Sequence, residues 1–336
     1  MAAIKDLPKQ FDIKKQMTDF IENSKNSTTG VGKGDYLVKH GSAKIPFPMT
    51  LVIPDLPKFQ AHRDDVAICG IAKSGASRFS ALVGMIMHDA NPVYLYQEPD
   101  MQEKVPWLEF CTGAGEKGPR GIDQISLIPS PRAYWTRLAF DGLPPSVHTQ
   151  HAKVVYHLRH PKDTLVTLYH NYMARKATVR FSGNISTMVD YLVTDEISCG
   201  PWFDHMASYW AHRDDPDVHI CSFEDFSQKP TESIIQLANF LGKNLTDTQV
   251  KQIAFDCHWD QMSKNPMTNH ESNAAVGEFN FNVTKFMRSG VVGGWKEHID
   301  SEQNERINTW MKTNLQRPDL AGIAERFPST FATESV

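Results

Sequence analysis

The sequence predicts an α/β fold with a central, mainly parallel sheet flanked by helices. Two observations carry this prediction. Short apolar, β-prone runs alternate along the chain with segments whose apolar residues recur at helical spacing. In addition, hydrophobic residues make up 40% of the 336 residues and charged residues 22%, which is typical of a globular protein with a sizeable core.

The predicted strands and helices follow one another in order. The run VAICGIA (66–72) is the first strand, and a helix-like apolar pattern follows it. NPVYLY (91–96) is short and β-prone, so a strand is expected there. The later elements are expected at 152–158 (strand), 164–176 (helix), 217–225 (strand) and 230–242 (helix).

Helix boundary signals support the last of these elements. The segment PTESIIQLANFLG begins with Pro and Thr and closes on Gly242, which is the usual order of start and stop signals. Thr246 and Gln249 then form a candidate capping box, so another helix is expected to begin after Thr246.

The polar N-terminal segment and the alternating strands and helices after it define the expected domain organisation. Residues 1–45 are polar and crowd three glycines between positions 30 and 34, so they are expected to form a loosely packed arm. Residues 46–330 are expected to form one α/β domain. Within it, residues 111–122 form a glycine-rich loop.

Composition excludes several classes of protein. The net charge of −4 offers no global basic field for nucleic acid or an anionic membrane. The N-terminus has no apolar segment of the secretory kind, and no run approaches the roughly 20 apolar residues that span a bilayer. The five cysteines are scattered and unpaired in sequence, and neither they nor the histidines have ligand spacing, so no metal site is expected. A cytoplasmic protein with reduced thiols is the simplest interpretation.

The turn after the first predicted strand offers groups that bind phosphate. KSGAS (73–77) supplies successive backbone amides, two hydroxyls and an ammonium group at the start of a helix. Gly75 allows the backbone to approach a ligand closely. An ordinary loop with a surface lysine is the alternative interpretation of this segment.

Two further segments contain arginines that can bind an anion. Arg159 ends the strand 152–158, and Thr167 lies on the helix that follows, so both can contact one phosphate. An ion pair between Arg159 and Asp163 is the alternative. Arg288 lies in the glycine-rich segment FMRSGVVGGWKEH (286–298), which can fold over a ligand or remain a solvated loop.

Taken together, KSGAS, RHPKD (159–163) and FMRSGVVGGWK resemble the cytosolic sulfotransferases, which transfer a sulfuryl group from 3′-phosphoadenosine-5′-phosphosulfate (PAPS) to a small acceptor and release PAP. The resemblance extends from about Phe47 to beyond Trp295. It includes secondary markers at PWLEF (106–110), SPR (130–132), GPWFDH (200–205), FED (223–225) and KNPMTN (264–269). It implies a single α/β domain with a parallel sheet.

The resemblance assigns the donor site to these segments. It implies that Lys73 is the catalytic lysine that stabilises charge on the bridging oxygen of the donor. Arg159 and Thr167 match the pair that binds the 3′-phosphate. The remaining residues implied at the phosphates are Ser74, Gly75, Ala76, Ser77, Phe286, Met287, Arg288, Ser289 and Gly290. Neutral Ser289 replaces a lysine of the family pattern, so weaker nucleotide binding is expected.

The implied adenine site departs from the family pattern. The family stacks the base between a Trp and a Phe, where this chain has Arg78 and Trp259. A guanidinium plane and an indole can both stack on a base. Phe223 and Cys257 replace a Tyr and a Thr near the adenine edge, and both lose a hydroxyl, so looser recognition of the edge is expected.

The largest departure concerns the reaction itself. Family members carry Lys-Thr-His after SPR, and that His removes the proton of the acceptor hydroxyl. Here Trp135, Thr136 and Arg137 stand in those positions, and the interval to Arg159 is unchanged. Arginine cannot be a general base because it stays protonated in proteins. Loss of a positioned base typically costs roughly 10²- to 10⁴-fold in rate.

Three hypotheses follow from this substitution. The first is a sulfotransferase of acidic or amine acceptors in which Arg137 orients the acceptor, or one in which His148, His151 or His170 replaces the base. The second is a catalytically silent homologue that binds the nucleotide in a binding or regulatory role. The third hypothesis is a different reaction on the same scaffold, such as sulfation followed by elimination.

The resemblance also bears on the acceptor and the oligomeric state. Trp107 and Phe110 lie in a segment that lines the acceptor pocket of relatives, although core packing is an equal alternative. Many relatives dimerise through a motif near the C-terminus. This chain keeps Lys296 and Glu305 of that motif but has Asp300 and Ser301 between them, so a monomer or weak dimer is expected.

Overall fold

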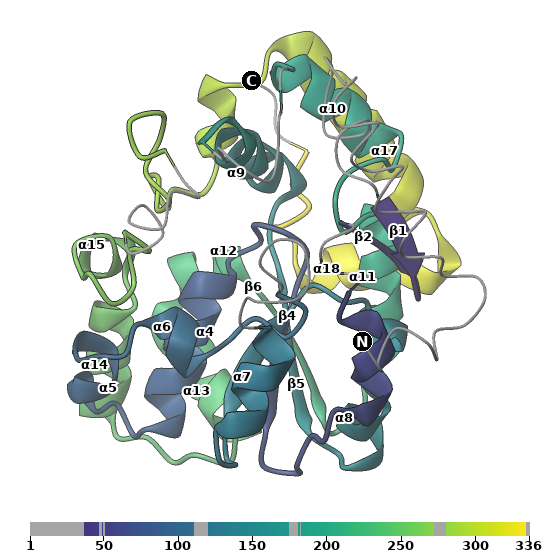
Figure 1. Ribbon diagram of the computed structural model, residues 1–336. Helices are drawn as coiled ribbons and strands as arrows, with labels where there is room; N and C mark the ends of the chain where they lie inside the picture. The colour runs from purple at the N-terminus through teal and green to yellow at the C-terminus, as the bar shows by residue number, and fades with distance from the viewer. Residues whose placement is uncertain are drawn as a thin grey trace.

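The protein folds around a four-stranded parallel sheet with the strand order β4-β3-β5-β6, in a computed structural model that describes residues 37–46, 49, 51–110, 120–174, 181, 183–271 and 280–333 (Figure 1). The strands are β3 (Val66–Cys69), β4 (Ala133–Thr136), β5 (Lys153–Leu158) and β6 (Val218–Ser222). This arrangement confirms the predicted fold class, and three of the strands coincide with predicted runs.

The helices connect and cover these strands. The α-helices are α4 (Ala76–Met87), α5 (Pro92–Tyr96), α6 (Met101–Lys104), α7 (Gly121–Leu127), α8 (Pro145–Thr149), α9 (Pro161–Ala174), α10 (Ile185–Val193), α11 (Trp202–Trp210), α12 (Phe223–Gln228), α13 (Pro230–Phe240), α14 (Asp247–Asp256), α15 (Trp259–Met262), α17 (Ser301–Leu315) and α18 (Ile323–Arg326). The 3₁₀ helices are η2 (Ile53–Lys58), η3 (Phe140–Gly142), η4 (Gly294–Glu297) and η5 (Pro318–Leu320). None of the helices described combines the length and apolarity needed for a bilayer span.

The strands are apolar on consecutive positions because both faces of the sheet are covered. In β3, Val66 and Ile68 pack into one hydrophobic cluster with α4 and α13, whereas Ala67 and Cys69 pack into the other with α11. Figure 1 shows α4 and α13 on one side of the sheet and α8 and α11 on the other. Burying each large aliphatic side chain contributes about 1.5–3 kcal/mol, so the two faces together hold the sheet in place.

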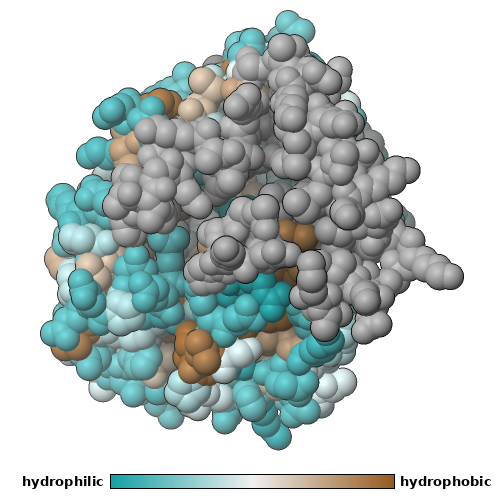
Figure 2. Space-filling model, in the orientation of Figure 1, coloured by the Kyte–Doolittle hydropathy of each residue, from teal (hydrophilic) through white to brown (hydrophobic). Residues whose placement is uncertain are grey.

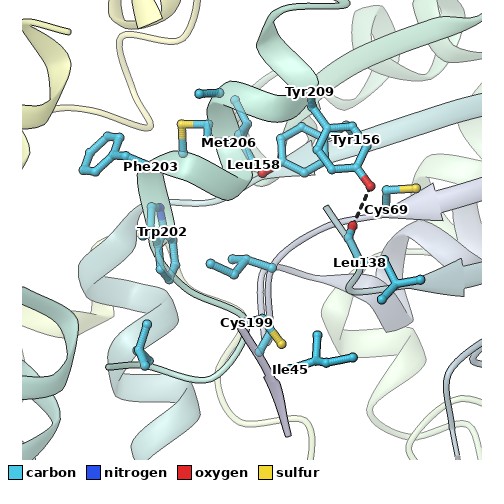
Figure 3. Packing of buried hydrophobic residues seen from close by; sticks show 14 of the residues in the cluster. Ile45, Cys69, Leu138, Tyr156, Leu158, Cys199, Trp202, Phe203, Met206 and Tyr209 are labelled. Carbon is cyan, nitrogen blue, oxygen red and sulfur yellow. Dashed lines mark hydrogen bonds between the residues drawn. The ribbon is translucent and has the colours of Figure 1, made fainter. Parts of the chain in front are cut away.

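The cluster on the α11 side contains a ladder of aromatic rings. Tyr156 of β5 stacks on Tyr209 of α11, with ring centroids 4.0 Å apart (Figure 3). The Tyr209 hydroxyl donates a hydrogen bond of 2.7 Å to the Leu138 carbonyl, just after β4. This bond fixes the backbone that leaves β4 against α11.

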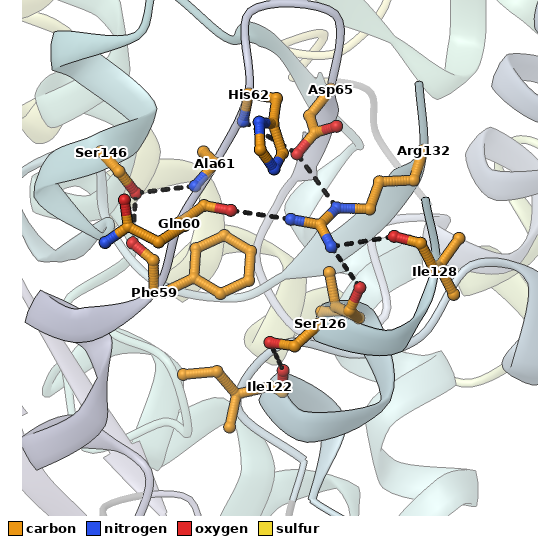
Figure 4. A network of polar contacts seen from close by, with 11 residues as sticks. Phe59, Gln60, Ala61, His62, Asp65, Ile122, Ser126, Ile128, Arg132 and Ser146 are labelled. Atoms are coloured by element: carbon orange, nitrogen blue, oxygen red, sulfur yellow. Dashed lines mark hydrogen bonds and ion pairs between the residues drawn. The ribbon is translucent and has the colours of Figure 1, made fainter. Parts of the chain in front are cut away.

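The opposite, amino-terminal edge of the sheet is held by a buried ion pair. Arg132, immediately before β4, donates from Nε to Asp65 Oδ2 at 3.0 Å, immediately before β3 (Figure 4). Its remaining guanidinium nitrogens donate to the carbonyls of Gln60, Ile125 and Ile128. All the nitrogens of this guanidinium are therefore satisfied by the protein itself.

Of two expectations about local structure, one is wrong and one is confirmed. NPVYLY forms the helix α5 rather than a strand, because the Asn91 side chain accepts a hydrogen bond from the Val93 amide and Pro92 occupies the first turn. The predicted capping box of Thr246 and Gln249 is present at the start of α14.

The N-terminal segment enters the core before the expected domain start. β1 (Leu37–His40) and β2 (Ala43–Pro46) form an antiparallel hairpin, in which Ala43 and Ile45 are fully buried. The expected boundary between residues 45 and 46 thus falls inside β2. Residues 1–36 of the expected arm, and residues 111–119 of the expected glycine-rich loop, lie outside the described residues.

The described surface in Figure 2 is mostly hydrophilic, with hydrophobic residues scattered over it. Large hydrophobic side chains that are more than half exposed include Leu127 and Phe255. Isolated residues of this kind are common on protein surfaces.

Candidate active site

The predicted site residues gather where the four parallel strands end. β3 leads into the turn that contains Lys73, and the residues that follow the other three strands are Arg137, Arg159 and Phe223. The carboxyl edge of a parallel sheet is where α/β proteins bind ligands. The order of the strands places Lys73 between Arg137 on one side and Arg159 on the other.

The turn after β3 has the backbone geometry of an anion site. Ser74 is buried, and its hydroxyl donates to the Ile71 carbonyl at 2.6 Å and lies 3.0 Å from His157 Nδ1. Gly75 has φ 125° and serves as the N-cap of α4, a conformation that favours glycine. The amides of Ala76 and Ser77 open the helix and have no partners within it. The turn therefore presents unpaired donors at a helix N-terminus, where an anion is stabilised.

Lys73 links this turn to two other segments. Its backbone has φ 66°, and its carbonyl accepts a hydrogen bond of 3.1 Å from Arg159 Nη1. Its ammonium nitrogen lies 3.9 Å from the centroid of the Phe286 ring. The lysine is thus held between β5 and the segment that begins at Phe286.

Arg159 and Thr167 are brought together as predicted. Arg159 Nη1 lies 3.4 Å from Thr167 Oγ1, and the Thr167 hydroxyl donates to the Asp163 carbonyl at 2.8 Å. The alternative pairing of Arg159 with Asp163 is not what the structure shows. The Asp163 carboxylate instead accepts from the amides of Gly293 (2.7 Å) and Trp295 (2.9 Å).

These two amide contacts place the 286–290 segment beside Arg159. Arg288 Nη2 lies 3.0 Å from His298 Nε2. Burial lowers the pKa of Arg288, and the positive charge of Arg159 lowers it further. Two guanidinium groups that repel each other at one place are stabilised by a bound anion.

In the segment 286–290, some residues are packed against the protein and others are exposed. Gly290 has φ 62° and lies so close to Trp259 that a Cβ there would be 2.6 Å from the indole. Met287 packs against the cluster on the α4 side, whereas Ser289 is exposed. Gly290 therefore allows the segment to lie directly on Trp259.

Unpaired buried donors support the same ligand chemistry. Among the residues described, Arg159 Nε, Arg78 Nε and Trp259 Nε1 are buried without a hydrogen-bond partner. A buried donor left unpaired costs about 1–3 kcal/mol, so such groups usually have a ligand or water to bind. The residues present therefore fit an anionic ligand that also carries groups able to accept hydrogen bonds.

Of the residues predicted around the adenine, Arg78 lies over the ring of Phe223, and Arg159 of the predicted phosphate site lies over the same ring. The Cζ atoms of Arg159 and Arg78 lie 4.4 Å and 5.1 Å from the centroid of buried Phe223. Arg78 also donates to Ser227 Oγ (2.8 Å) and to a backbone carbonyl of α12. Cys257 is buried at the end of α14, two residues before Trp259. The stacking of Arg78 on a base stays a prediction.

The Arg137 guanidinium lies on an aromatic wall formed by the rings of Trp107, Phe110 and Trp135. Its Cζ is 4.0 Å from the centroid of Trp107, which stacks on Trp135 at 4.5 Å and lies 5.5 Å from Phe110. The wall forms because Leu108 and Pro106 exchange backbone hydrogen bonds with Trp135, so this segment runs beside β4. The structure describes no polar partner for the Arg137 guanidinium.

The buried carboxylate of Glu109 binds the backbone amide of Arg137 and not its guanidinium group. Glu109 Oε1 accepts from the Arg137 amide at 2.6 Å, and Oε2 accepts from the Thr136 hydroxyl at 2.7 Å. Burial raises the pKa of Glu109, and these hydrogen bonds oppose that effect. Glu109 thereby fixes the position of Arg137 and leaves its guanidinium available.

Comparison with known proteins identifies the family. The family model described as "Sulfotransferase domain" matches residues 63–319, which include all the site residues described above. The chain belongs to the sulfotransferase family. It is 32% identical over 257 residues to sulfotransferase 1C2 of Rattus norvegicus, with 76% of this chain and 85% of the relative covered.

Solved structures of sulfotransferase relatives share the fold. The crystal structure of retinol dehydratase in complex with retinol and PAP has a TM-score of 0.74 at 21% identity, with 83% of this chain and 89% of that chain covered. Mouse sulfotransferase SULT7A1 complexed with PAP has a TM-score of 0.66 at 21% identity, with 87% and 98% covered. The chain is accordingly a transferase enzyme of the sulfuryl-transfer class, acting on small-molecule acceptors.

The histidines suggested from sequence lie elsewhere or are engaged. His151 precedes β5, at the amino edge of the sheet, and pairs with Asp217 at 2.9 Å. His148, also near that edge, packs its ring on Phe140. His170 lies beside His298, with ring centroids 5.0 Å apart, and burial followed by the charge of Arg288 lowers its pKa to about 4.

Sequence reasoning missed one histidine of this sulfotransferase. His270 Nε2 lies 2.8 Å from Ser77 Oγ, and its ring lies 4.1 Å from that of Phe286. It directly follows the KNPMTN marker, but Ser77 is 193 positions away, so no local pattern indicated the contact.

Proposed function

We propose that this sulfotransferase transfers the sulfuryl group of PAPS to a hydroxyl or amine of a small acceptor, without the usual His after β4. The observation that carries the donor is the position of Arg159, whose Nη1 donates to the Lys73 carbonyl beside the N-terminus of α4 and lies 3.4 Å from Thr167 Oγ1. A ligand with phosphates at two positions fits Arg159 and Arg288 on one side and the α4 turn on the other.

The protein groups have separate roles in holding this donor. Arg159, Thr167 and Arg288 would hold the 3′-phosphate, and the turn 74–77, through the amides of Gly75, Ala76 and Ser77, would hold the 5′-phosphosulfate. The donor supplies an activated sulfuryl group. Lys73, already held at the turn by Arg159 and Phe286, stabilises the negative charge that develops on the leaving phosphate.

Arg137 determines how the acceptor binds in this proposal. Its guanidinium is permanently charged, stacks on Trp107 and has no described anionic partner. An acceptor that carries an acidic hydroxyl or a carboxylate beside an aromatic ring matches this combination of cation and apolar wall. Trp107 and Phe110 would then line the acceptor pocket.

A second function is favoured by the same substitution. With Arg137 in the place of the family's His, the protein would bind PAPS or PAP and exert a regulatory effect without turnover. The two functions predict the same nucleotide site and differ only in sulfuryl transfer.

The first experiment measures nucleotide binding and transfer together. Isotherms for PAPS and PAP are recorded with the wild type and with Lys73→Ala, and transfer of labelled sulfate is measured on phenols, hydroxy acids, alcohols and amines. Transfer by the wild type that is lost in Arg137→Ala supports the enzyme. Transfer by Arg137→His alone supports the silent homologue, and absence of nucleotide binding overturns both.

We also propose a cytoplasmic monomer or weak dimer. Four cysteines, Cys69, Cys199, Cys221 and Cys257, are free and buried, which agrees with a reducing compartment. Asp300 caps α17 through Gln303, so this charged residue occupies the middle of the motif through which relatives dimerise. A tight dimer in sedimentation, dispersed by substitutions in residues 296–305, would contradict the weak-dimer proposal.

A further inference from the structure

The environment of His270 joins the donor turn to the catalytic lysine. Its Nε2 lies 2.8 Å from the hydroxyl of Ser77, in the first turn of α4. Its ring contacts Phe286, which also lies 3.9 Å from the Lys73 ammonium group, measured to the ring centroid. The residue is partly exposed and has φ 62°, a left-handed conformation that is uncommon for residues other than glycine.

Burial and, to a lesser extent, the charge of Lys73 favour the neutral form of this ring. Burial lowers the pKa of His270 to about 4, the charge of Lys73 acts in the same direction, and Asp100 opposes both. A neutral imidazole carries a proton on one nitrogen and a lone pair on the other. At neutral pH the ring can therefore accept one proton.

Two other buried histidines near this edge are bound to core groups, whereas Nε2 of His170, beside His298 and Arg288, is buried without a partner among the described residues. In His205, Nδ1 lies 3.1 Å from the Tyr156 hydroxyl and Nε2 lies 3.0 Å from the Arg137 carbonyl. In His157, Nδ1 faces Ser74, and the ring stacks on Phe79 inside the core. For His270 the described residues provide a partner at Nε2 only.

The Ser77 contact decides which nitrogen of His270 carries the proton. A serine hydroxyl has one proton and can accept from other donors. If that proton is donated to the 5′-phosphate of a bound donor, the Ser77 oxygen can only accept, so Nε2 must be the protonated nitrogen. The lone pair is then on Nδ1.

We propose that His270 is the general base of this enzyme and that donor binding through Ser77 sets its tautomer. The proposal rests on the proposed function, because it requires PAPS at the α4 turn. The acceptor hydroxyl gives its proton to Nδ1 as its oxygen bonds to sulfur. The bond between sulfur and the bridging oxygen breaks, its electron pair stays on the phosphate of PAP beside Lys73, and the imidazolium later releases its proton to water.

Variants with matched backbones test this role. His270→Asn removes the base at φ 62°, and His151→Asn makes the same change at φ 55° on the amino edge of the sheet. Asn tolerates this conformation, so both variants should fold. We expect kcat/KM of His270→Asn to fall by about 10²-fold or more, with PAP affinity within a few-fold of the wild type and His151→Asn unaffected.

Two readouts separate a base from a structural role. In His270→Gly, added imidazole should restore part of the transfer, and the acid limb of the kcat/KM profile should be present in the wild type and absent from His270→Asn. Independently of activity, ¹⁵N spectra of histidine-labelled protein should show Nδ1 of His270 becoming the unprotonated nitrogen when PAP is added. The same spectra of Ser77→Ala should not show this change.

Each outcome bears on the proposal. Equal transfer and an unchanged pH profile in His270→Asn, with a wild type that is active, would overturn the base while leaving the proposed function intact. Protonation of Nδ1 in the PAP complex would overturn the tautomer. A wild type that binds PAP but transfers to no acceptor would overturn the base together with the enzymatic function.

Discussion

Arg132 and Arg137 lie at the two ends of strand β4, and their environments differ sharply. Arg132 is 6% exposed, and every nitrogen of its guanidinium donates to Asp65 or to a backbone carbonyl (Figure 4). Arg137 is only partly buried. Its guanidinium lies on the ring of Trp107, while its backbone amide and not its charge is bound by Glu109.

At the amino edge the protein supplies all the acceptors of a cation, and the result is a fixed junction of β3 and β4. At the carboxyl edge, the Arg137 guanidinium has no described polar partner and Arg159 Nε is buried without one. Because unpaired buried donors cost stability and are concentrated at functional sites, we propose that the amino-edge arginine is structural and that the carboxyl-edge arginines bind a ligand.

The largest expected effect on stability comes from replacing Arg132, the arginine at the amino edge of the sheet. Arg132→Ala leaves the carboxylate of Asp65, which is fully buried, without its counter-charge. Removal of one partner of a buried ion pair typically costs 3–5 kcal/mol, so the free energy of unfolding should fall by about that amount. Urea unfolding followed by circular dichroism measures the change.

Arg137→Ala is the matched control for this experiment. It removes a cation–π contact worth about 0.5–2 kcal/mol and leaves no buried charge unpaired. Stability should therefore change little. If Arg137→Ala were as destabilising as Arg132→Ala, the division of the two arginines into structural and functional roles would be wrong.

The sequence predicted the carboxyl edge of the sheet well because its signals are local. A strand followed by a turn with Lys73 and Ser74, and a strand followed by Arg159, are patterns of a few residues, and parallel order brings them together. The wrong prediction at 91–96 also has a local cause. There the Asn91 cap and Pro92 outweighed the β preference of the apolar residues.

Contacts between distant segments could not be predicted in this way. The alternative interpretation paired Asp163 with Arg159, four residues away, but Asp163 binds amides of the segment 293–295, which no local pattern indicated. His270 meets Ser77 only after the chain has passed through the whole sheet. Such contacts depend on the packing of complete elements, which periodicity and spacing do not encode.

A smaller effect is expected from removing Arg288, one of the cations at the carboxyl edge. Arg288→Gln should weaken PAP binding by about 10- to 100-fold, because a charge-assisted hydrogen bond contributes about 1.5–3 kcal/mol. Burial and the charge of Arg159 already lower the pKa of Arg288, so the free protein should lose no stability. Calorimetric titration with PAP and urea unfolding of the same variant check both parts. Loss of stability without loss of affinity would make Arg288 a structural residue like Arg132.

The smallest expected effect is on PAP affinity, when a positive charge is added beside Arg288. Ser289 is exposed beside Arg288, so Ser289→Lys adds a cation where relatives have one. An exposed charge pair contributes about 0.2–1 kcal/mol, so PAP should bind up to about fivefold tighter at low salt, and the gain should fade as salt screens it. Thr313→Lys adds the same charge to the exposed face of α17 and serves as the control for net charge. Equal tightening in the two variants would show that the protein's overall field, and not a site at Ser289, attracts the nucleotide.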